Sequence, residues 1–353
     1  MVVARSVNKR PCLVETGPAR RAPSKPPRVY IEETRPNWDG FIGMHCGRPR
    51  VVVEWMLFRS QVITAWGALS SAYHNILSAD QSYWLVYPSV GDEIFFIDFG
   101  YTAIIYHAGG FVKWSKDVVP KSEISTLTDL GFVVLVPNYR LCPQISVFNG
   151  PIADSRDCLV WAANELPGLL QNESVEGSAP EVPVKAVLDF YGLKYFSDPT
   201  WRLPIPEFEQ SPSWSQEYID KIYEGHQVSA SPRFLGDGTL PPRDAWFATH
   251  MKQGTLLDEL VKNEDKSTID GTVRFSTLFP QTMFIHGTAD KVTHHRFSER
   301  AHEELKRLGV VTDLLLADGE DHVFDLTLEE DDLKFVQYVL PGLKFLARAV
   351  GLL

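Results

Sequence analysis

The chain has 353 residues, of which 44% are hydrophobic, and this is enough to bury one large core. Its formal net charge of -11 at pH 7 leaves no broad basic surface for phosphates and therefore disfavours nucleic-acid binding. The four cysteines form no C-x-x-C pair, which favours a reduced compartment over a disulfide framework and gives no support for a metal site.

The beginning of the chain is rich in arginine and lysine, with prolines between them. We predict a disordered tail over residues 1–30. An organelle transit peptide is the alternative, but prolines break the amphipathic helix that such peptides need. No run of about 18 apolar residues occurs, so no membrane span is expected. No apolar secretory signal follows Met1, and the expected location is the cytoplasm.

Residues 31–100 give weak local signals. Val51–Phe58, Ser82–Tyr87 and Glu93–Phe99 combine aromatic and β-branched residues, a composition typical of strands. We therefore expect strands in this part of the chain, without a motif that assigns them a function.

The first strong signal is an apolar strand, Ala103–Tyr106, that runs directly into the loop His107-Ala108-Gly109-Gly110-Phe111. Adjacent glycines let the backbone adopt conformations and close approaches that a side chain would prevent. Such a loop is either an ordinary turn after a core strand or a place where the backbone closely approaches a bound group.

Strands and helices alternate from there on, which predicts a mostly parallel sheet with right-handed crossovers and helices on both faces. A helix over Pro120–Leu130 starts at a proline and stops at Gly131. Phe132–Val136 is continuously apolar, as a strand buried on both faces should be. A helix over Ile152–Leu166 and a buried strand over Val184–Phe190 follow.

The segment Asp198–Asp270 has a different composition, with aromatic residues scattered among prolines and acids. It predicts a cap over a binding pocket, or else a surface excursion with its own small core. Strands resume at Thr282–His286 and Val310–Leu316, with a helix between them that is closed by Gly309. A last amphipathic helix is expected over Lys334–Leu346.

Four segments together resemble one family, the α/β hydrolases, in the esterase branch that includes hormone-sensitive lipase. The glycine loop resembles the His-Gly-Gly-Gly segment of these esterases, and Pro137–Gln144 is similar to their Tyr-Arg-Leu-Ala-Pro-Glu segment. Ile285–Val292 looks like the turn that bears the triad acid, and Gly319–Phe324 looks like the loop that bears the triad histidine.

The resemblance implies an α/β-hydrolase fold, with a mostly parallel central sheet, helices on both faces and an inserted cap. Residues 31–197 would form the first part of the hydrolase core, 198–270 the cap and 271–353 the second part of the core. The combination of segments looks most like fungal members of the family, some of which act in secondary metabolism.

The resemblance also implies a chemistry, the hydrolysis of a carboxylic ester or a related acyl group. His322 would be the general base and Asp290 the acid that orients it. His107, Gly109 and Gly110 would form the oxyanion site, with N–H donors from the two glycines. The expected partner is a small apolar ester or acyl substrate, and the chemistry needs no cofactor and no metal.

The departure from the family concerns the nucleophile. In relatives a strand, a Gly-x-Ser-x-Gly turn and a helix precede the strand that matches Val184–Phe190, and they need at least about 25 to 30 residues. Only Pro167–Pro183 stands there, and no serine of this chain lies in Gly-x-Ser-x-Gly. The nearest remnant is Ser178, which is otherwise an ordinary loop serine.

The central strand and its helix are therefore expected to be missing. Two hypotheses follow: an esterase whose elbow this sequence omits, or a non-catalytic or vestigial homologue that at most binds a small apolar ligand.

Overall fold

The computed structural model describes residues 101–166, 184–231, 239–262 and 264–353, together with three short strands nearer the N-terminus. The predicted strands over 51–58 and 93–99 lie outside the described residues, and so does the interval 167–183 that holds Ser178. The predicted tail over 1–30 also lies outside them, except for Val2–Ala4, which form a strand instead.

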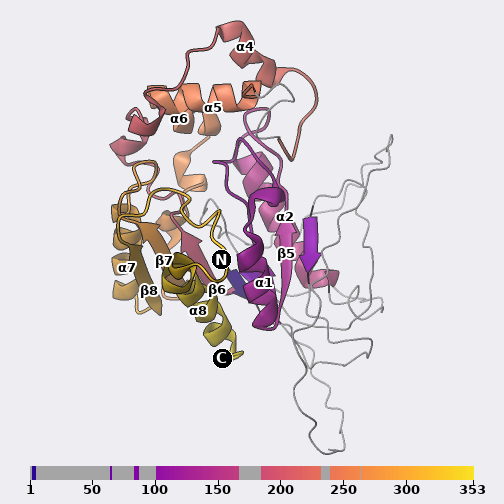
Figure 1. The fold of residues 1–353 in the computed structure, drawn as a ribbon, viewed down its shortest axis with the longest axis vertical. Helices are drawn as coiled ribbons and strands as arrows, with labels where there is room; N and C mark the ends of the chain where they lie inside the picture. Colours follow the sequence, from indigo (N-terminus) through magenta and orange to yellow (C-terminus); the bar gives the residue numbers. More distant parts are fainter. Residues whose placement is uncertain are drawn as a thin grey trace, which may run out of the picture.

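The described strands form one mixed sheet in the order β3-β5-β4-β1-β6-β7-β8, with β2 paired to β1 (Figure 1). Their bounds are β1 Val2–Ala4, β2 Thr64–Ala65, β3 Tyr83–Val86, β4 Tyr101–Ile104, β5 Phe132–Pro137, β6 Val184–Phe190, β7 Gln281–Gly287 and β8 Thr312–Ala317. β4 and β5 are parallel, β6, β7 and β8 are parallel, and β3 is antiparallel to β5. β5 is fully buried, whereas β8 begins at Thr312 rather than at the predicted Val310 and is half-buried, because it lies at the edge of the sheet.

The centre of the sheet differs from the prediction. β1 lies between β4 and β6 and runs antiparallel to both, with Val3 opposite Ala103 and Val2 opposite Val187. The position that a missing central strand would have left open is therefore occupied by a short strand of opposite direction. Because β1 is antiparallel, its carboxyl end points away from the edge at which β4 and β6 end.

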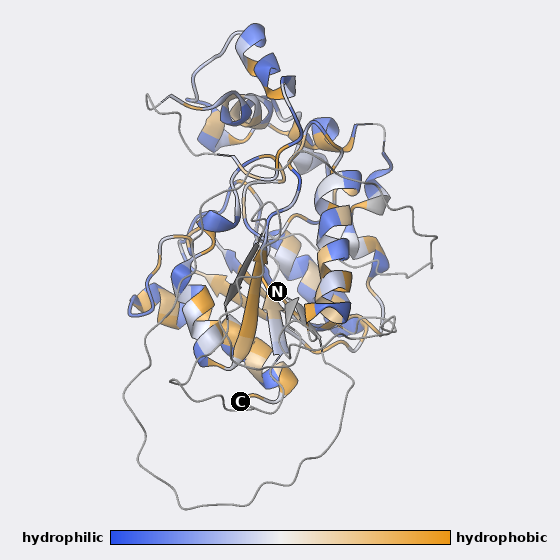
Figure 2. Cartoon of the chain, turned by 90° about the vertical axis from the view of Figure 1, so that its right-hand side faces the viewer, coloured by the Kyte–Doolittle hydropathy of each residue, from blue (hydrophilic) through white to orange (hydrophobic). Residues whose placement is uncertain are grey.

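Helices cover both faces of the sheet, as predicted. The helical bounds are α1 Lys121–Asp129, α2 Ala153–Asn164, α4 Gln216–Asp220, α5 Pro242–Gln253, α6 Leu256–Val261, α7 Arg296–Arg307 and α8 Leu340–Val350. Along β4, Ala103 packs with α1 and α8 while Ile104 packs with α2, as the alternation of side chains in a strand requires. α7 packs against the second face through Phe297. Figure 2 shows the apolar strands inside and hydrophilic residues on the outer surfaces of the helices.

Two helices start differently from their predicted bounds. A π-helical turn at Phe148–Ile152 precedes α2, and another at Phe335–Val339 precedes α8. Pro151 lies in the first turn, and Pro341 is the second residue of α8, which follows the second turn. Because proline has no N–H to donate, neither helix can continue the regular α-helical hydrogen bonding backwards through this point.

The segment predicted as a cap consists of α4, α5, α6 and short 3-10 turns, and it lies at one end of the sheet (Figure 1). The 3-10 turns of the described chain are Lys116–Val118, Pro199–Arg202, Pro206–Phe208, Lys221–Tyr223, Lys266–Thr268 and Gly271–Arg274. Trp246 of α5 and Leu257 of α6 belong to the same hydrophobic cluster as Ile104 of the sheet. The segment therefore shares its core with the sheet. None of the helices described has the length and apolar character needed to cross a bilayer.

Candidate active site

Strands β4 to β8 run in the same direction and end at one edge of the sheet, and the loops after three of them carry the predicted site residues. His107 follows β4, Asp290 follows β7 and His322 follows β8. Loops at the carboxyl ends of parallel strands meet at one edge, where ligands of α/β proteins usually bind. The strand order therefore gathers residues that are far apart in the sequence.

Asp290 and His322, predicted as an acid and base pair, are in direct contact. His322 Nδ1 lies 2.7 Å from Asp290 Oδ2. The Asp290 side chain is completely buried, whereas 19% of the His322 side chain is exposed. The other carboxylate oxygen, Oδ1, accepts the backbone N–H groups of Val292 and Thr293, each at 2.8 Å. The aspartate is thus fixed on one side by its own turn and on the other by His322.

The charge state of Asp290 follows from these contacts. Burial alone would raise the pKa of the carboxyl group, but hydrogen bonds from His286 and His322 outweigh burial and hold that pKa well below its usual range. Asp290 is therefore a carboxylate, and His322 donates its Nδ1–H to it. The lone pair of His322 is then on Nε2, which has no hydrogen-bond partner among the residues described.

A second histidine, which the sequence did not single out, contacts the same carboxylate. His286 Nε2 lies 3.2 Å from Asp290 Oδ2 and 2.5 Å from the carbonyl oxygen of Thr293. Its Nδ1 lies 2.8 Å from Ser298 Oγ. Burial lowers the pKa of His286, so the ring is neutral, and Nε2 carries the proton because both of its neighbours are acceptors. The available signal was its position in the strand-end turn, four residues before Asp290.

His107 is completely buried, and its ring does not line the cavity described below. Its Nδ1 lies 2.6 Å from the carbonyl oxygen of Ala108, and its ring stacks on Tyr139. Burial lowers the pKa of His107 to about 4, so the ring is neutral at pH 7. The side chain thus contacts the glycine loop from outside the cavity, and the place of His107 in the oxyanion site stays a prediction.

The two glycines have backbone conformations that fit their residue type. Gly109 has a φ of 118° and Gly110 a φ of 59°. A Cβ atom at Gly109 would lie 2.0 Å from the carbonyl oxygen of Lys113, so the loop can close only around a glycine. No backbone hydrogen bond within the described chain uses the N–H of Gly109 or Gly110. Within the described residues, neither N–H therefore has a backbone acceptor.

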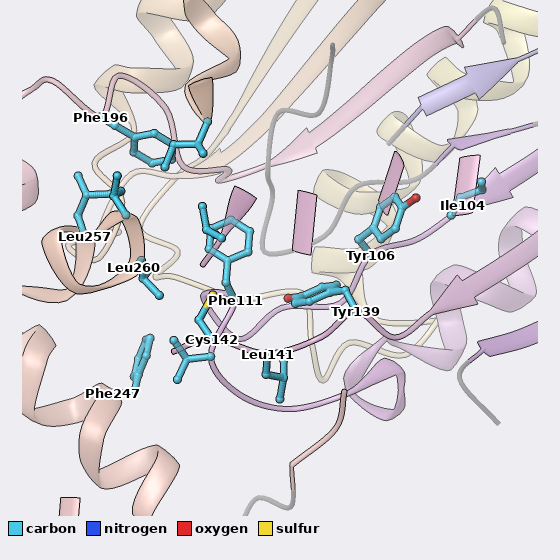
Figure 3. Packing of buried hydrophobic residues seen from close by; sticks show 14 of the residues in the cluster. Ile104, Tyr106, Phe111, Tyr139, Leu141, Cys142, Phe196, Phe247, Leu257 and Leu260 are labelled. Atoms are coloured by element: carbon cyan, nitrogen blue, oxygen red, sulfur yellow. The ribbon is translucent and has the colours of Figure 1, made fainter. Parts of the chain in front are cut away.

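One cavity of about 310 Å³ joins these parts. His322 and the glycine loop line it together with residues of α5 and α6. Its apolar wall includes Phe111, Phe196, Ile205, Phe208, Phe247, Met251, Leu257 and Leu260. Figure 3 shows Phe111 of the glycine loop among Leu257, Leu260 and Phe196. An apolar cavity with a few convergent polar groups is the usual form of a small-molecule site.

A second cavity of about 510 Å³ shares Trp114 with the first and extends along Ser115–Ser122 and Leu326–Glu330. It is larger and more polar, but it contains none of the predicted site residues. We assign the candidate site to the smaller cavity because the chemical groups converge there.

The described residues that line the candidate site include no serine, threonine or cysteine. Cys142 and Cys158 are free thiols outside the cavity, and burial raises the pKa of each to about 12. Both are therefore protonated at neutral pH and unsuited to nucleophilic attack. Ser178, the nearest remnant of a nucleophile turn in the sequence, lies outside the described residues.

The structure offers no metal centre in the part that it describes, where no three His, Cys, Asp or Glu side chains are grouped as metal ligands. His294 and His295 lie against each other, with ring centroids 4.6 Å apart, and His302 contacts Thr312. These histidines therefore have ordinary surface contacts.

The sequence is similar to fungal polyketide synthases. It is 26% identical over 317 residues to the non-reducing polyketide synthase ausA of Emericella nidulans, which covers 71% of this chain and 13% of that protein. It is 28% identical over 283 residues to mapC of Penicillium brevicompactum, covering 64% of this chain and 12% of that protein. The chain thus spans about an eighth of the length of these curated relatives. No protein-family model matches it.

Among solved structures, a protein of unknown function from Staphylococcus aureus Mu50 has the same fold, with a TM-score of 0.54 and 14% identity. The match covers 75% of this chain and 94% of that one. Thermogutta terrifontis esterase 2 phosphonylated by sarin gives a TM-score of 0.47 at 15% identity, over 81% of this chain and 96% of that one. Apart from the short antiparallel strand β1 at its centre, the sheet with its helical layers forms the predicted α/β-hydrolase fold.

Proposed function

We propose that this protein hydrolyses an acyl bond, in a carboxylic ester or a thioester, at the apolar cavity. The proposal is supported by one cavity that is lined by His322 of the Asp290–His322 pair and by two glycines whose N–H groups have no backbone acceptor among the described residues. Acyl hydrolysis needs a base, a group that orients it, and donors for the oxygen that becomes negative. No cofactor or metal takes part.

In the proposed reaction, His322 Nε2 accepts the proton of an O–H nucleophile as its oxygen attacks the acyl carbon. The carbonyl oxygen takes the electron pair and becomes an oxyanion, which the N–H groups of Gly109 and Gly110 stabilise. When the tetrahedral species collapses, the leaving alkoxide or thiolate takes the proton from His322. Asp290 keeps the imidazole in one orientation and stabilises its positive charge.

Two nucleophiles are compatible with this scheme. Ser178 would form an acyl-serine that water then hydrolyses, and a water molecule in the cavity would release the acid in one step. A fluorophosphonate probe distinguishes them, because it modifies an activated serine. An adduct that is lost in Ser178→Ala identifies the serine, whereas hydrolysis without an adduct identifies water.

The substrate that we propose carries an apolar acyl or alcohol group that fits under α5 and α6. The aromatic and aliphatic wall of the cavity supports this choice. The similarity to fungal polyketide synthases over most of the chain supports a role in secondary metabolism. We place the activity in the cytoplasm, because free thiols such as Cys142 and Cys158 are typical of a reduced compartment.

The test is hydrolysis of short-chain p-nitrophenyl esters, and of matched thioesters, by the full chain. We expect His322→Ala to lower the turnover rate by about 10²–10⁴-fold, the usual contribution of a positioned base. His226→Ala is the matched control, because His226 is exposed and lies outside the cavity. A folded wild-type protein that hydrolyses neither substrate class would refute the proposal.

A second candidate is binding without turnover. It is favoured by the lack of a Gly-x-Ser-x-Gly motif and by the reversed strand at the centre of the sheet. Trp201 lines the cavity, so its fluorescence should change when a non-hydrolysable alkyl ketone is titrated. Saturable binding together with no hydrolysis would select this candidate, and saturable binding with hydrolysis would select the first.

A further inference from the structure

Tyr191 occupies an unusual position behind the candidate site. It follows the last residue of β6, its side chain is completely buried, and its φ is 42°. A positive φ is uncommon for a bulky residue and persists only where surrounding contacts impose it. One such contact is the Tyr191 N–H, which donates to the carbonyl oxygen of Ile285 in β7 at 2.9 Å.

The ring of Tyr191 lies against both histidines that contact Asp290. Its centroid is 4.8 Å from that of His322, with 59° between the planes, and 6.3 Å from that of His286, with 79° between the planes. Tyr191 itself does not line the cavity. It therefore touches the proposed base from behind, on the side away from a bound substrate.

The hydroxyl group of Tyr191 is anchored as well. It donates a hydrogen bond to Asp325 Oδ1, and only 1% of Asp325 is exposed. Asp325 lies three residues after His322 on the same loop. The loop that carries the proposed base is thus held by Asp290 at His322 and by Tyr191 at Asp325.

We propose that Tyr191 and Asp325 are positioning residues for His322. The Nδ1 hydrogen bond to Asp290 fixes one atom of the imidazole but still permits the ring to tilt about that contact. The Tyr191 ring blocks this tilt. The hydrogen bond from Tyr191 to Asp325 fixes the position of the loop, so that His322 Nε2 stays directed into the cavity. The proposal rests on the proposed function, and it adds the residues that hold the base in place.

The expected kinetic effect follows from where Tyr191 lies. Because Tyr191 does not touch the cavity, its substitution should lower kcat and change KM by less than about twofold. A displacement of about 1 Å in a reacting group lowers the rate by about 10²-fold, so we expect a loss of about 10- to 100-fold in Tyr191→Leu. Tyr191→Phe keeps the ring and removes the hydroxyl group, so its loss should be smaller.

Tyr195 provides a matched control. It is also buried, has a φ of 56°, and donates its hydroxyl group to a carboxylate, Glu304 Oε2, at 2.8 Å. Its ring packs on Phe297 instead of on His322. Tyr195→Leu should therefore lower the unfolding midpoint as Tyr191→Leu does, while its kcat stays within about twofold of the wild type.

Two substitutions of Asp325 test whether the hydrogen bond from Tyr191 matters apart from the size of the side chain. Asp325→Asn keeps an acceptor for the Tyr191 hydroxyl group and should retain most of the wild-type kcat. Asp325→Leu removes the acceptor and should resemble Tyr191→Phe in kcat. If Asn and Leu at position 325 lower kcat equally, the hydrogen bond has no positioning role and the proposal is wrong.

A second measurement does not require turnover. In histidine ¹⁵N NMR spectra of the wild type, His322 should give the signal of a single Nδ1–H tautomer, and in Tyr191→Phe and Tyr191→Leu this signal should broaden or shift toward the averaged tautomers. The signal of His226 should not change. An unchanged His322 signal in both variants would overturn the proposal and leave the proposed function intact. If the wild type shows no hydrolysis, this NMR comparison decides the positioning role by itself.

Discussion

The imidazole ring of His107 lies flat on the phenol ring of Tyr139, with the centroids 4.2 Å apart and the planes within 7° of each other. The Tyr139 hydroxyl group also donates to the carbonyl oxygen of His107, at 3.2 Å. The segment after β5 therefore holds the glycine loop after β4 by both ring stacking and a hydrogen bond.

This contact should be measurable in two steps. Tyr139→Phe keeps the ring and removes the hydroxyl group, so the free energy of unfolding should fall by about 1 kcal/mol, the net value of one hydrogen bond. Tyr139→Leu also removes the stacked ring, and a further loss of about 0.5–1.5 kcal/mol is expected. Urea unfolding of both variants gives the two values. If Tyr139→Phe and Tyr139→Leu lose the same free energy of unfolding, the ring stacking does not stabilise the loop.

The burial of His107 predicts a pH dependence of stability. Its pKa is about 4 in the folded chain, and about 6.5 in an unfolded chain. Between these values the unfolded state binds more protons, so the stability is present above about pH 6.5 and is lost as the pH falls toward about 4. From pH 7 to pH 5 the loss from this one residue should be about 2 kcal/mol.

In His107→Gln, the fall in unfolding free energy between pH 7 and pH 5 should be smaller by this amount. Urea unfolding at the two pH values measures the difference. His226→Gln, at an exposed histidine, is the control and should keep the wild-type difference between the two pH values. A His107→Gln variant with the full wild-type difference would mean that this ring is not held neutral by burial.

The close approach at Gly109 predicts a graded effect of alanine. Gly309→Ala introduces a side chain at a φ of 77° in open space, so only backbone strain of about 1–2 kcal/mol is expected. Gly109→Ala adds the overlap with the Lys113 carbonyl oxygen, and its loss of unfolding free energy should exceed about 3 kcal/mol. Thermal unfolding ranks the two variants. A Gly109→Ala variant as stable as Gly309→Ala would contradict the loop geometry.

The cavity wall predicts a change in acyl-chain preference. Leu257 of α6 lines the cavity and is 7% exposed, so Leu257→Phe should shorten the space available to a chain. We expect kcat/KM for p-nitrophenyl octanoate to fall about 10-fold, while kcat/KM for p-nitrophenyl acetate changes by less than about twofold. Leu278→Phe, at a residue that is 91% exposed, is the control. Equal losses for octanoate and acetate would place the acyl chain elsewhere.

The elements that the sequence predicted well are those with a strong local signal. The continuously apolar run Phe132–Val136 specifies a buried strand by itself, and Gly131 and Pro120 mark the ends of a helix. The loops of Asp290 and His322 were identified by their resemblance to the turn and loop that bear a triad acid and histidine, and parallel strands then bring them to one edge. That geometry makes their contact a consequence of topology.

The rest depends on contacts that no local pattern encodes. Tyr191 and Asp325 are 134 residues apart, and their hydrogen bond exists only after β6 and the loop beyond β8 have met. In the sequence His286 is an ordinary residue at the end of a strand. Its contact with the Asp290 carboxylate is evident only in the structure. The strand at Val2–Ala4 was missed because three apolar residues beside many prolines and arginines carry too little signal to predict pairing.

That short strand gives the sheet a mechanical weak point. Within the described chain, β1 alone joins the β3-β5-β4 half to the β6-β7-β8 half by strand pairing, through a few residue pairs. The glycine loop with the proposed oxyanion donors belongs to the first half, and the proposed acid and base belong to the second. A substitution that shifts the register at Val3 would therefore slide the two halves past each other, and the groups of the proposed site would lose their alignment without any of them being altered.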